Sequence, residues 1–273
     1  MAAHGDTADD TASDAADDAD RNGPGDADRN GPGGDAHRNG PNRPRLHRRS
    51  FVVEPFSEAC GAVWERRQHV VFGVSPGNSY FNEARLAVLL DWLRAEFARV
   101  DVVVPDSALE HTYLALDYDA RRAARKARAE TNVLHNRVTR AWDSVGGRRA
   151  GDGLHRMSEL VPHPVYRERL VECEEALAED EVLWDTCAEM SREVLTLKGF
   201  EGPFTTERLR RAVRYLLAEL PFFLASAEIF GAPTSLNFYH RPLPLAELVF
   251  SGKSLLRPGP GQGYATIRPV QSA

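Results

Sequence analysis

Two short apolar runs on either side of a helix-like segment constrain the fold of this chain most strongly. Residues 70–74 are apolar and rich in β-branched side chains, and they stop at a Ser-Pro-Gly-Asn turn, as a buried strand does. Residues 101–104 repeat this character and are closed by Pro105. Between the two runs, apolar residues recur at helical spacing, at Leu86, Leu89, Leu90, Leu93 and Phe97. This order predicts a βαβ unit, whose crossover makes the two strands parallel.

The remainder of the pattern extends this unit into an α/β fold. Helical periodicity and apolar runs predict further helices at about residues 118–143, 163–180, 181–197 and 205–220, and further strands at about 235–240 and 264–270. We therefore expect a Rossmann-like parallel sheet with added helices. Ligands of such sheets bind outside the carboxyl ends of the strands, and Ser75 stands at such an end.

Composition divides the chain near residue 50. Residues 1–40 hold ten Asp and three Arg and repeat an Asp-Ala-Asp-Arg-Asn-Gly-Pro-Gly unit with almost no large apolar residue. Such a segment cannot bury enough apolar surface to fold, so residues 1–50 are predicted to form a disordered acidic Gly/Pro/Asp-rich tail. Residues 51–273 are predicted to form a single folded domain. Residues 1–40 carry a net charge of −7 while the whole chain carries −6, which leaves residues 41–273 near neutral, at +1.

The sequence carries no signal for a metal site, a cofactor or a membrane span. Cys60, Cys173 and Cys187 lack ligand spacing and are odd in number, so neither a zinc site nor a disulfide framework is expected. No P-loop or G-x-G-x-x-G occurs, and there is neither an N-terminal secretion signal nor an apolar run of about 18 residues. We expect a cytoplasmic protein without cofactor or metal.

Three interpretations of Ser75 are open. Ser-Pro-Gly-Asn is an ordinary turn between a strand and a helix, because all four residue types favour turns. Residues 73–77 also match G-x-S-x-G, the nucleophile elbow of serine hydrolases, with Asp185 and His240 available for a triad. Too few residues precede the serine for that fold, and no HGGG-type loop is present. The third interpretation depends on a second stretch, at residues 214–221.

That second stretch places Tyr215 and Glu219 four residues apart, on one face of a predicted helix that Pro221 ends. By itself, the stretch is more typical of an ordinary amphipathic helix with a packed tyrosine and a solvated glutamate. It becomes informative only in combination with the strand that leads to Ser75.

Taken together, the two stretches resemble the signatures of the cyclodipeptide synthases. His69-Val-Val-Phe-Gly-Val-Ser75 is similar to the family's His-x-aliphatic-aliphatic-Gly-aliphatic-Ser strand, except for Phe72 in an aliphatic position. Tyr215-Leu-Leu-Ala-Glu219-Leu-Pro matches the family's Tyr-x-x-x-Glu-x-Pro helix. The resemblance implies an aminoacyltransferase that makes a cyclic dipeptide from two aminoacyl-tRNAs, on a fold similar to the catalytic domain of class I aminoacyl-tRNA synthetases. Asn78, Tyr239 and His240 resemble the markers of the subfamily named for Asn, Tyr and His.

The resemblance also implies the mechanism. The serine attacks the first aminoacyl ester to give an aminoacyl-enzyme, and no ATP is needed because the ester is already activated. A carboxylate and a tyrosine hydroxyl hold the free ammonium. A second tyrosine assists ring closure, for which His240 as a general base is the alternative. The implied catalytic set is Ser75, Tyr215, Glu219, Tyr239, Asn78 and Tyr166.

Two substrate pockets follow from the same resemblance. Both are mainly apolar, which favours apolar or aromatic amino acids, with Trp, Tyr and Phe as candidates. Asn237 departs from the aliphatic residue of relatives that take Phe, and it is expected to hydrogen-bond a polar substrate group. The first pocket is expected to comprise Val71, Gly73, Val103, Met157 and Asn237, and the second Met190, Ser191, Leu197, Phe222 and Phe223, with His240 nearby.

A basic segment is the expected tRNA contact. Residues 119–149 carry a local net charge of +6, and phosphate contacts would make activity fall as salt rises. Relatives carry their densest cluster in the middle of this helix, whereas here residues 129–136 are almost free of basic side chains. A monomer is expected, with two aminoacyl-tRNAs as its partners. The expected tRNA-binding residues are Arg121, Arg122, Arg125, Lys126, Arg128, Arg137 and Arg140.

Overall fold

The computed structural model describes residues 51–270, so the predicted acidic tail lies outside the described residues. The strands are β1 (Phe51–Pro55), β2 (His69–Gly73), β3 (Arg99–Val104), β4 (Gly153–Arg156), β5 (Ser235–Tyr239) and β6 (Gln262–Pro269). The α-helices are α1 (Glu58–Arg66), α2 (Glu83–Glu96), α3 (Leu109–Ala115), α4 (Ala120–Ser144), α5 (Met157–Leu160), α6 (Pro164–Glu179), α7 (Glu181–Leu197), α8 (Thr206–Ile229) and α9 (Pro244–Phe250). A short 3-10 helix, η1 (Ser79–Phe81), precedes α2.

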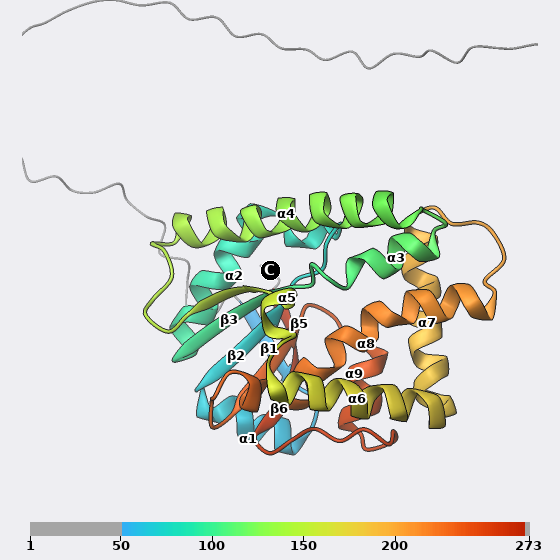
Figure 1. Cartoon of the computed structure of the whole chain (residues 1–273). Helices are drawn as coiled ribbons and strands as arrows, with labels where there is room; N and C mark the ends of the chain where they lie inside the picture. Colours follow the sequence, from blue (N-terminus) through green and yellow to red (C-terminus); the bar gives the residue numbers. More distant parts are fainter. Residues whose placement is uncertain (1–50, 271–273) are drawn as a thin grey trace, which may run out of the picture. The chain divides into compact units, whose positions relative to one another are not determined.

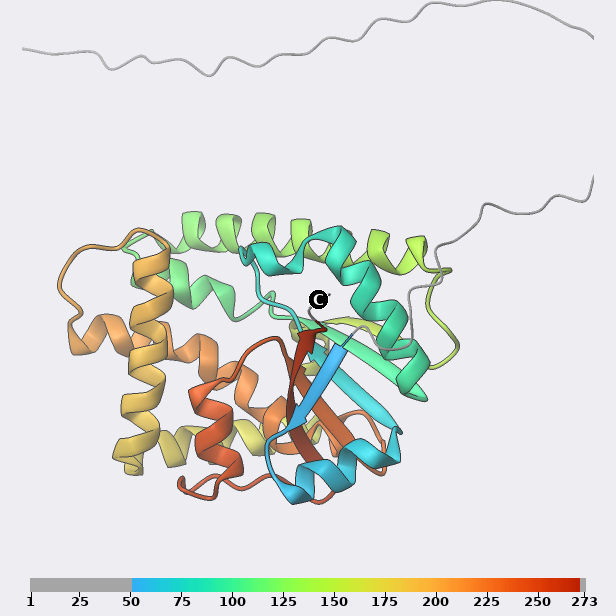
Figure 2. The same ribbon diagram turned by 180° about the vertical axis from the view of Figure 1, so that it is seen from behind.

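These strands form one sheet in the order β1-β6-β5-β2-β3-β4 (Figure 1). The five strands from β2 to β6 are mutually parallel, and β2, α2 and β3 form the predicted βαβ unit. The predicted α/β fold is therefore confirmed. One detail differs, because β1 runs antiparallel to β6 at the edge of the sheet (Figure 2). Doubly wound sheets often carry such an edge strand, and β1 alternates partly buried and exposed residues as an edge requires.

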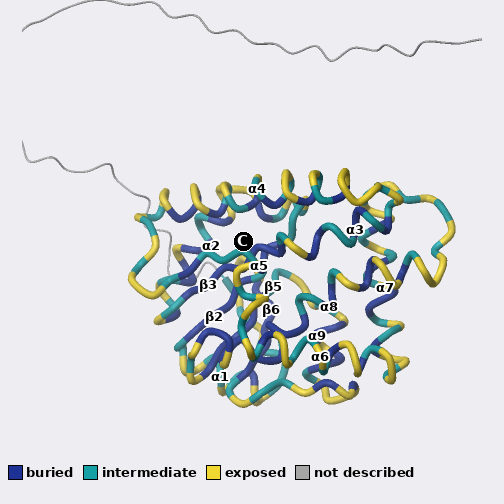
Figure 3. Tube along the Cα trace, in the orientation of Figure 1, coloured by how far each residue is buried: buried dark blue, intermediate teal, exposed yellow. Residues whose placement is uncertain are grey.

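Helices cover both faces of the sheet and make two apolar cores. The strands are buried on both sides, as the burial colouring of Figure 3 shows, because consecutive side chains of β2 point to opposite faces. Val70 and Phe72 pack with α2 and α4 on one face. Val71 packs with α6, α8 and α9 on the other. Burial on both faces explains the continuous apolar runs in the sequence.

The strand order changes direction between β5 and β2. From β2 the chain adds β3 and then β4 on one side, whereas β5 and β6 are added on the other side. Loops that leave the carboxyl ends of the strands diverge at such a point and leave a crevice. Ser75 follows β2 and Tyr239 ends β5, so both lie at this crevice.

Helix α8 is longer than predicted. Pro221 was expected to end the helix, but α8 continues to Ile229 with a non-helical residue at Ala225. Proline removes a backbone donor and costs about 3 kcal/mol inside a helix. The turns beyond it are almost entirely apolar and buried, at Phe222, Leu224, Ala225, Ala227 and Ile229, and this burial offsets the cost.

Candidate active site

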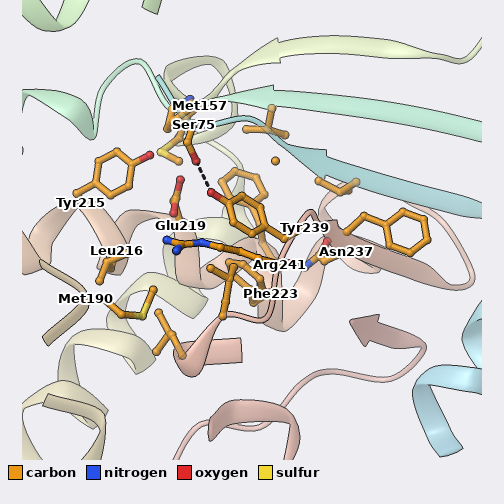
Figure 4. Close-up of a pocket in the computed structure, with 18 of the residues that line it drawn as sticks. Ser75, Met157, Met190, Tyr215, Leu216, Glu219, Phe223, Asn237, Tyr239 and Arg241 are labelled. Carbon is orange, nitrogen blue, oxygen red and sulfur yellow. Dashed lines mark hydrogen bonds between the residues drawn. The ribbon is translucent and has the colours of Figure 1, made fainter. Parts of the chain in front are cut away.

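Ser75 faces Tyr239 at the carboxyl edge of the sheet. The register pairs Phe72 of β2 with Phe238 of β5, so the two strands end side by side. The Ser75 Oγ and the Tyr239 Oη lie 2.9 Å apart, within hydrogen-bond distance (Figure 4). Burial raises the pKa of Tyr239, so its hydroxyl is protonated at neutral pH and can donate. Within residues 51–270, no histidine makes a hydrogen bond to Ser75.

A single cavity brings together most of the predicted site residues. Its lining is apolar apart from a few polar groups at one end, as is common for small-molecule sites. The strands and their following loops supply one wall, and α7 and α8 supply the other. The predicted residues that line it are Val71, Gly73, Ser75, Val103, Met157, Met190, Tyr215, Glu219, Phe222, Phe223, Asn237 and Tyr239.

Tyr215 and Glu219 reach the cavity from α8. Their spacing of four residues places them on one face of the helix, and Figure 4 shows both side chains directed toward Ser75. Burial raises the pKa of Glu219 to about 7, while the neighbouring Tyr215 hydroxyl opposes this shift. Burial, followed by the charge of Glu219, raises the pKa of Tyr215 well above its usual value. The cavity therefore holds a carboxylate whose ionised form a cationic ligand would stabilise.

Asn237 lines the cavity, but its amide is already engaged by the protein. Its Nδ2 donates to the carbonyl of Phe222 at 2.7 Å, and its Oδ1 accepts from the Ser226 hydroxyl at 3.1 Å. Both partners lie on α8, which is distorted at Ala225. The expected hydrogen bond from Asn237 to a substrate group is thus replaced by a contact that joins β5 to α8.

Tyr166 and Asn78 lie just outside the cavity lining. The Tyr166 ring is buried against Phe222, and its hydroxyl donates to the carbonyl of Ala218 at 2.9 Å, immediately before Glu219. Asn78 accepts a hydrogen bond from the Tyr80 backbone at 2.9 Å and thereby caps η1. Tyr166 therefore holds α8, which carries Tyr215 and Glu219, whereas Asn78 holds the turn that follows Ser75.

Three expected pocket residues lie elsewhere. Ser191 is buried beside a separate small cavity between α3, α7 and α8. Leu197 is the last residue of α7 and is 83% exposed, because the helix extends past the cavity. His240 stacks on the ring of Tyr80 with centroids 4.0 Å apart.

Several lining residues were absent from the sequence-based prediction. Arg241 and Leu243 belong to the loop that follows β5 and leads into α9, and Arg241 is the most polar of the added residues. The sequence does contain a signal for Arg241, because a cationic residue that directly follows the Tyr-His pair lies at the carboxyl end of a predicted strand. The added lining residues are Pro105, Val194, Leu216, Phe238, Arg241, Leu243 and Leu245.

His69 belongs to a buried ionic network at the other end of β2. Its Nε2 lies 2.9 Å from Asp101 Oδ2, while His155 Nε2 lies 2.7 Å from Asp101 Oδ1 and Arg99 Nε lies 2.6 Å from Oδ2. Burial by itself would raise the pKa of Asp101, but the two histidines and the arginine lower it below the usual range. The network joins β2, β3 and β4, which gives the motif histidine a structural role.

The basic residues of α4 fall into two groups. Arg137 donates to the carbonyl of Phe81 at 3.0 Å, and Arg140 pairs with Glu83 at 2.7 Å, so both attach α4 to the segment around η1. Lys126 lies over the ring of Tyr118. The four arginines of the first half are exposed and have no acceptor within the described part of the chain, namely Arg121, Arg122, Arg125 and Arg128.

Glu130, in the middle of α4, contacts the turn that follows Ser75. Its carboxylate accepts a hydrogen bond from the Tyr113 hydroxyl and pairs with Lys198 Nζ at 3.2 Å. Gly77 has a φ of +73°, and a Cβ at this position would overlap Glu130 Oε1. The turn thus requires glycine both for its backbone conformation and for space.

Within residues 51–270, no three His, Cys, Asp or Glu side chains are grouped to hold a metal ion. In the same residues, no helix combines the length and apolar character needed to cross a membrane.

Known proteins resemble this chain over nearly its whole described length. The family model described as "Cyclodipeptide synthase" matches residues 51–269. A Cyclo(L-tyrosyl-L-tyrosyl) synthase of Mycobacterium tuberculosis is 35% identical over 87% of this chain and 86% of its own length. A Cyclo(L-leucyl-L-phenylalanyl) synthase of Streptomyces noursei is 31% identical over 77% of this chain and 89% of its own.

The fold is likewise similar to solved structures. A Mycobacterium tuberculosis protein superposes with a TM-score of 0.71 at 35% identity, covering 81% of this chain and 94% of that one. Its description states that cyclodipeptide synthetases are related to type I tRNA synthetases. A cyclodipeptide synthase from Bacillus thermoamylovorans has a TM-score of 0.75 at 28% identity, covering 82% of this chain and 98% of the other.

Proposed function

Because this chain belongs to the cyclodipeptide synthase family, we propose that it joins two aminoacyl groups into a cyclic dipeptide through an ester on Ser75. Members of this family are tRNA-dependent aminoacyltransferases. The observation that carries the proposal is the content of one cavity. It holds a serine hydroxyl 2.9 Å from a tyrosine hydroxyl, together with a half-buried carboxylate.

In the first step, Ser75 Oγ attacks the carbonyl carbon of an aminoacyl-tRNA. A new ester bond forms, the bond to the terminal ribose oxygen breaks, and the serine proton passes to that oxygen. One ester replaces another, so the exchange needs no further activation and no strong base. A tyrosine next to Ser75, in place of a histidine, is consistent with this low demand, and it disfavours the serine hydrolase that G-x-S-x-G suggested.

Glu219 receives the ammonium of the bound aminoacyl group. A charge-assisted hydrogen bond to the ammonium stabilises the ionised carboxylate, which burial otherwise disfavours. The adjacent Tyr215 hydroxyl supplies a further polar contact on the same helix face. Tyr166 supports this arrangement through the carbonyl just before Glu219.

In the second step, the ammonium of the Ser75-bound residue loses a proton and the free amine attacks the carbonyl carbon of a second aminoacyl-tRNA. An amide bond forms, the bond to the ribose oxygen of that tRNA breaks, and the amine proton passes to this oxygen, which leaves a dipeptidyl ester on Ser75. The new terminal amine then attacks this ester, the bond to Ser75 Oγ breaks, and the diketopiperazine leaves. Tyr239, already in contact with Ser75 Oγ, is positioned to donate the proton that the serine oxygen needs as it departs.

We propose apolar or aromatic substrates. The cavity wall is dominated by aliphatic, aromatic and thioether side chains, and the amide of Asn237 is engaged by α8. Two relatives are named as synthases of cyclo(Tyr-Tyr) and cyclo(Leu-Phe), in agreement with such substrates. Asn78, Tyr239 and His240 further suggest the subfamily named for these residue types. A monomeric state and a cytoplasmic location stay predictions.

The catalytic unit is proposed to be residues 51–273, because the family match begins at residue 51. A chain without residues 1–45 is expected to keep its activity. Loss of activity in that truncated chain would place functional residues in the tail.

The proposed function is tested by expression in a bacterial host and mass spectrometry of the medium. A cyclic dipeptide should appear above the empty-vector control, and Ser75→Ala should abolish both the product and the acylation of the protein. Soluble protein without any diketopiperazine, or full activity in Ser75→Ala, would refute it.

A further inference from the structure

A cationic and aromatic cluster lies at the edge of the cavity. Tyr80 and His240 stack with centroids 4.0 Å apart and an interplanar angle of 20°. The Arg85 guanidinium lies 4.6 Å from the Tyr80 ring centroid. Arg241 follows His240 in the sequence, and Figure 4 shows Arg241 among the residues that line the cavity. We refer to Tyr80, Arg85, His240 and Arg241 as the mouth cluster.

The two arginines of the mouth cluster lack an anionic partner. Both residues are exposed, and neither guanidinium makes a hydrogen bond or ion pair within residues 51–270. Arg137, Arg140 and Lys198, by contrast, each bind a protein acceptor. Arg85 lies over the Tyr80 ring and Arg241 lines the cavity, and guanidinium groups without a carboxylate partner are available for an external anion.

Two buried polar atoms of the same cluster are also without partners in the described region. These are the Tyr80 hydroxyl and His240 Nδ1. Buried polar groups are normally hydrogen-bonded, so unpaired ones next to unpaired cations indicate a place where a polar ligand completes the contacts.

The cluster draws its positive charge from the arginines. Burial, and then the charges of Arg241 and Arg85, lower the pKa of His240 to about 4, so the imidazole is neutral at pH 7. Arg85 lies over the Tyr80 ring on which His240 stacks, and Arg241 follows His240 in the sequence, so both arginines belong to the surroundings of this imidazole. Two guanidinium groups around a neutral histidine form a compact site for one anionic group.

The proposed reaction brings an anion to this place. The ester that Ser75 attacks sits on the last ribose of the tRNA, and that nucleotide carries its 5′-phosphate a few bonds from the reacting carbonyl. Tyr239, which contacts Ser75, is followed in the sequence by His240 and then Arg241. The phosphate must therefore lie near the cavity mouth whenever the ester is in position for attack.

We propose that Arg85 and Arg241 bind the backbone phosphates of the single-stranded acceptor end of the aminoacyl-tRNA, with Tyr80 and His240 holding the arginines in place. This inference rests on the proposed function and assigns the mouth cluster a substrate contact separate from the exposed arginines of α4. The other anion that could bind these arginines, in place of a phosphate, is the carboxylate of an acidic substrate side chain. Phosphate is favoured because Arg85, the second guanidinium of the cluster, does not line the cavity that would receive a substrate side chain.

The test measures binding without chemistry. Uncharged tRNA ending in CCA and the same tRNA lacking CCA are bound to the full chain, and affinity is followed by fluorescence anisotropy over a range of salt. The wild-type chain should bind the CCA-ending tRNA about tenfold more tightly. Arg85→Gln with Arg241→Gln should remove that preference and lower the salt slope by about 0.7 per lost phosphate contact.

Matched variants exclude general effects of charge and folding. Arg66→Gln removes an exposed arginine from α1, before β2 begins and away from Ser75, and should leave the CCA preference unchanged. Arg241→Lys keeps the charge and should keep part of the preference. Thermal denaturation of each variant confirms that it is folded.

The outcomes separate this inference from the proposed function. A CCA preference that survives the double substitution overturns the phosphate contact, even if the chain makes a cyclic dipeptide. A change only in which amino acids enter the product would identify Arg241 as a carboxylate partner and would also overturn it. A lost preference in a chain whose wild type makes no diketopiperazine would support the contact and refute the proposed reaction.

Discussion

The Ser75 hydroxyl and the Tyr239 hydroxyl meet at 2.9 Å, at the point of the sheet where strand order changes direction. A serine whose polar partner is a tyrosine with a raised pKa lacks the strong base of a hydrolase triad. Such a serine suits an acyl donor that arrives activated, and the predictions below follow from this arrangement.

Tyr239→Phe should slow product formation by about 100-fold, within the range typical of lost acid–base assistance. If Tyr239 donates a proton to the departing Ser75 oxygen, the dipeptidyl ester should accumulate. Intact-mass spectrometry of the enzyme during turnover detects this ester as added mass on the protein. A variant that makes product at the wild-type rate would contradict the role of Tyr239.

Acylation of Ser75 should become faster as pH rises through about 7. Burial raises the pKa of Glu219 to about 7, and only the ionised carboxylate can hold the substrate ammonium. Single-turnover acylation is the step to follow, and it should fall again above a pH of about 8, where the substrate ammonium loses its proton. Glu219→Gln should react slowly and without this rise. An identical pH profile in the variant would assign the titration to another group.

Glu219→Gln should also make the unliganded protein more stable above pH 7. A carboxyl group whose pKa rises from 4.5 to about 7 on folding favours the folded state fully below pH 4.5, and this contribution is lost as pH rises through 7. The loss is on the order of 3 kcal/mol. Thermal denaturation at pH 5 and at pH 8 should show the gap between variant and wild type widening at the higher pH. A constant gap would show that Glu219 titrates normally.

Gly77→Ala should cost both stability and activity, because Gly77 has positive φ and Glu130 fills the space beside it. Gly147→Ala is the matched control, since Gly147 has a similar φ of +78° and open space around it. Backbone strain of about 1–2 kcal/mol is common to both variants. Urea denaturation should therefore show a larger loss for Gly77→Ala, and only this variant should slow acylation of Ser75. Equal losses would indicate that Glu130 does not restrain the turn.

The two groups of basic residues on α4 should behave differently. Replacing the exposed arginines by glutamine should weaken tRNA binding and flatten its salt dependence, because phosphate contacts release counterions. Replacing Arg137 and Arg140 should mainly lower thermal stability, because these side chains contact Phe81 and Glu83. Unchanged salt dependence in the first group would remove α4 from the tRNA interface. The first group comprises Arg121, Arg122, Arg125 and Arg128.

Sequence reasoning succeeded where a local pattern determines local structure. Buried β-branched runs identified β2 and β3, and helical periodicity identified α2 and α4. It missed β4, whose residues include glycine, histidine and arginine in place of an apolar run. It also ended α8 at Pro221, because burial of the following turns is a tertiary effect.

The candidate site shows the same division. The sequence by itself determined that Ser75 follows a buried strand and that Tyr215 and Glu219 share a helix face. Both features depend only on residues that are close together in the chain. Only the tertiary structure decided that Tyr239 meets Ser75, that Asn237 is engaged by α8 and that Leu197 points away. These contacts join segments more than ten residues apart, so strand order and helix packing control them, and no local pattern encodes either.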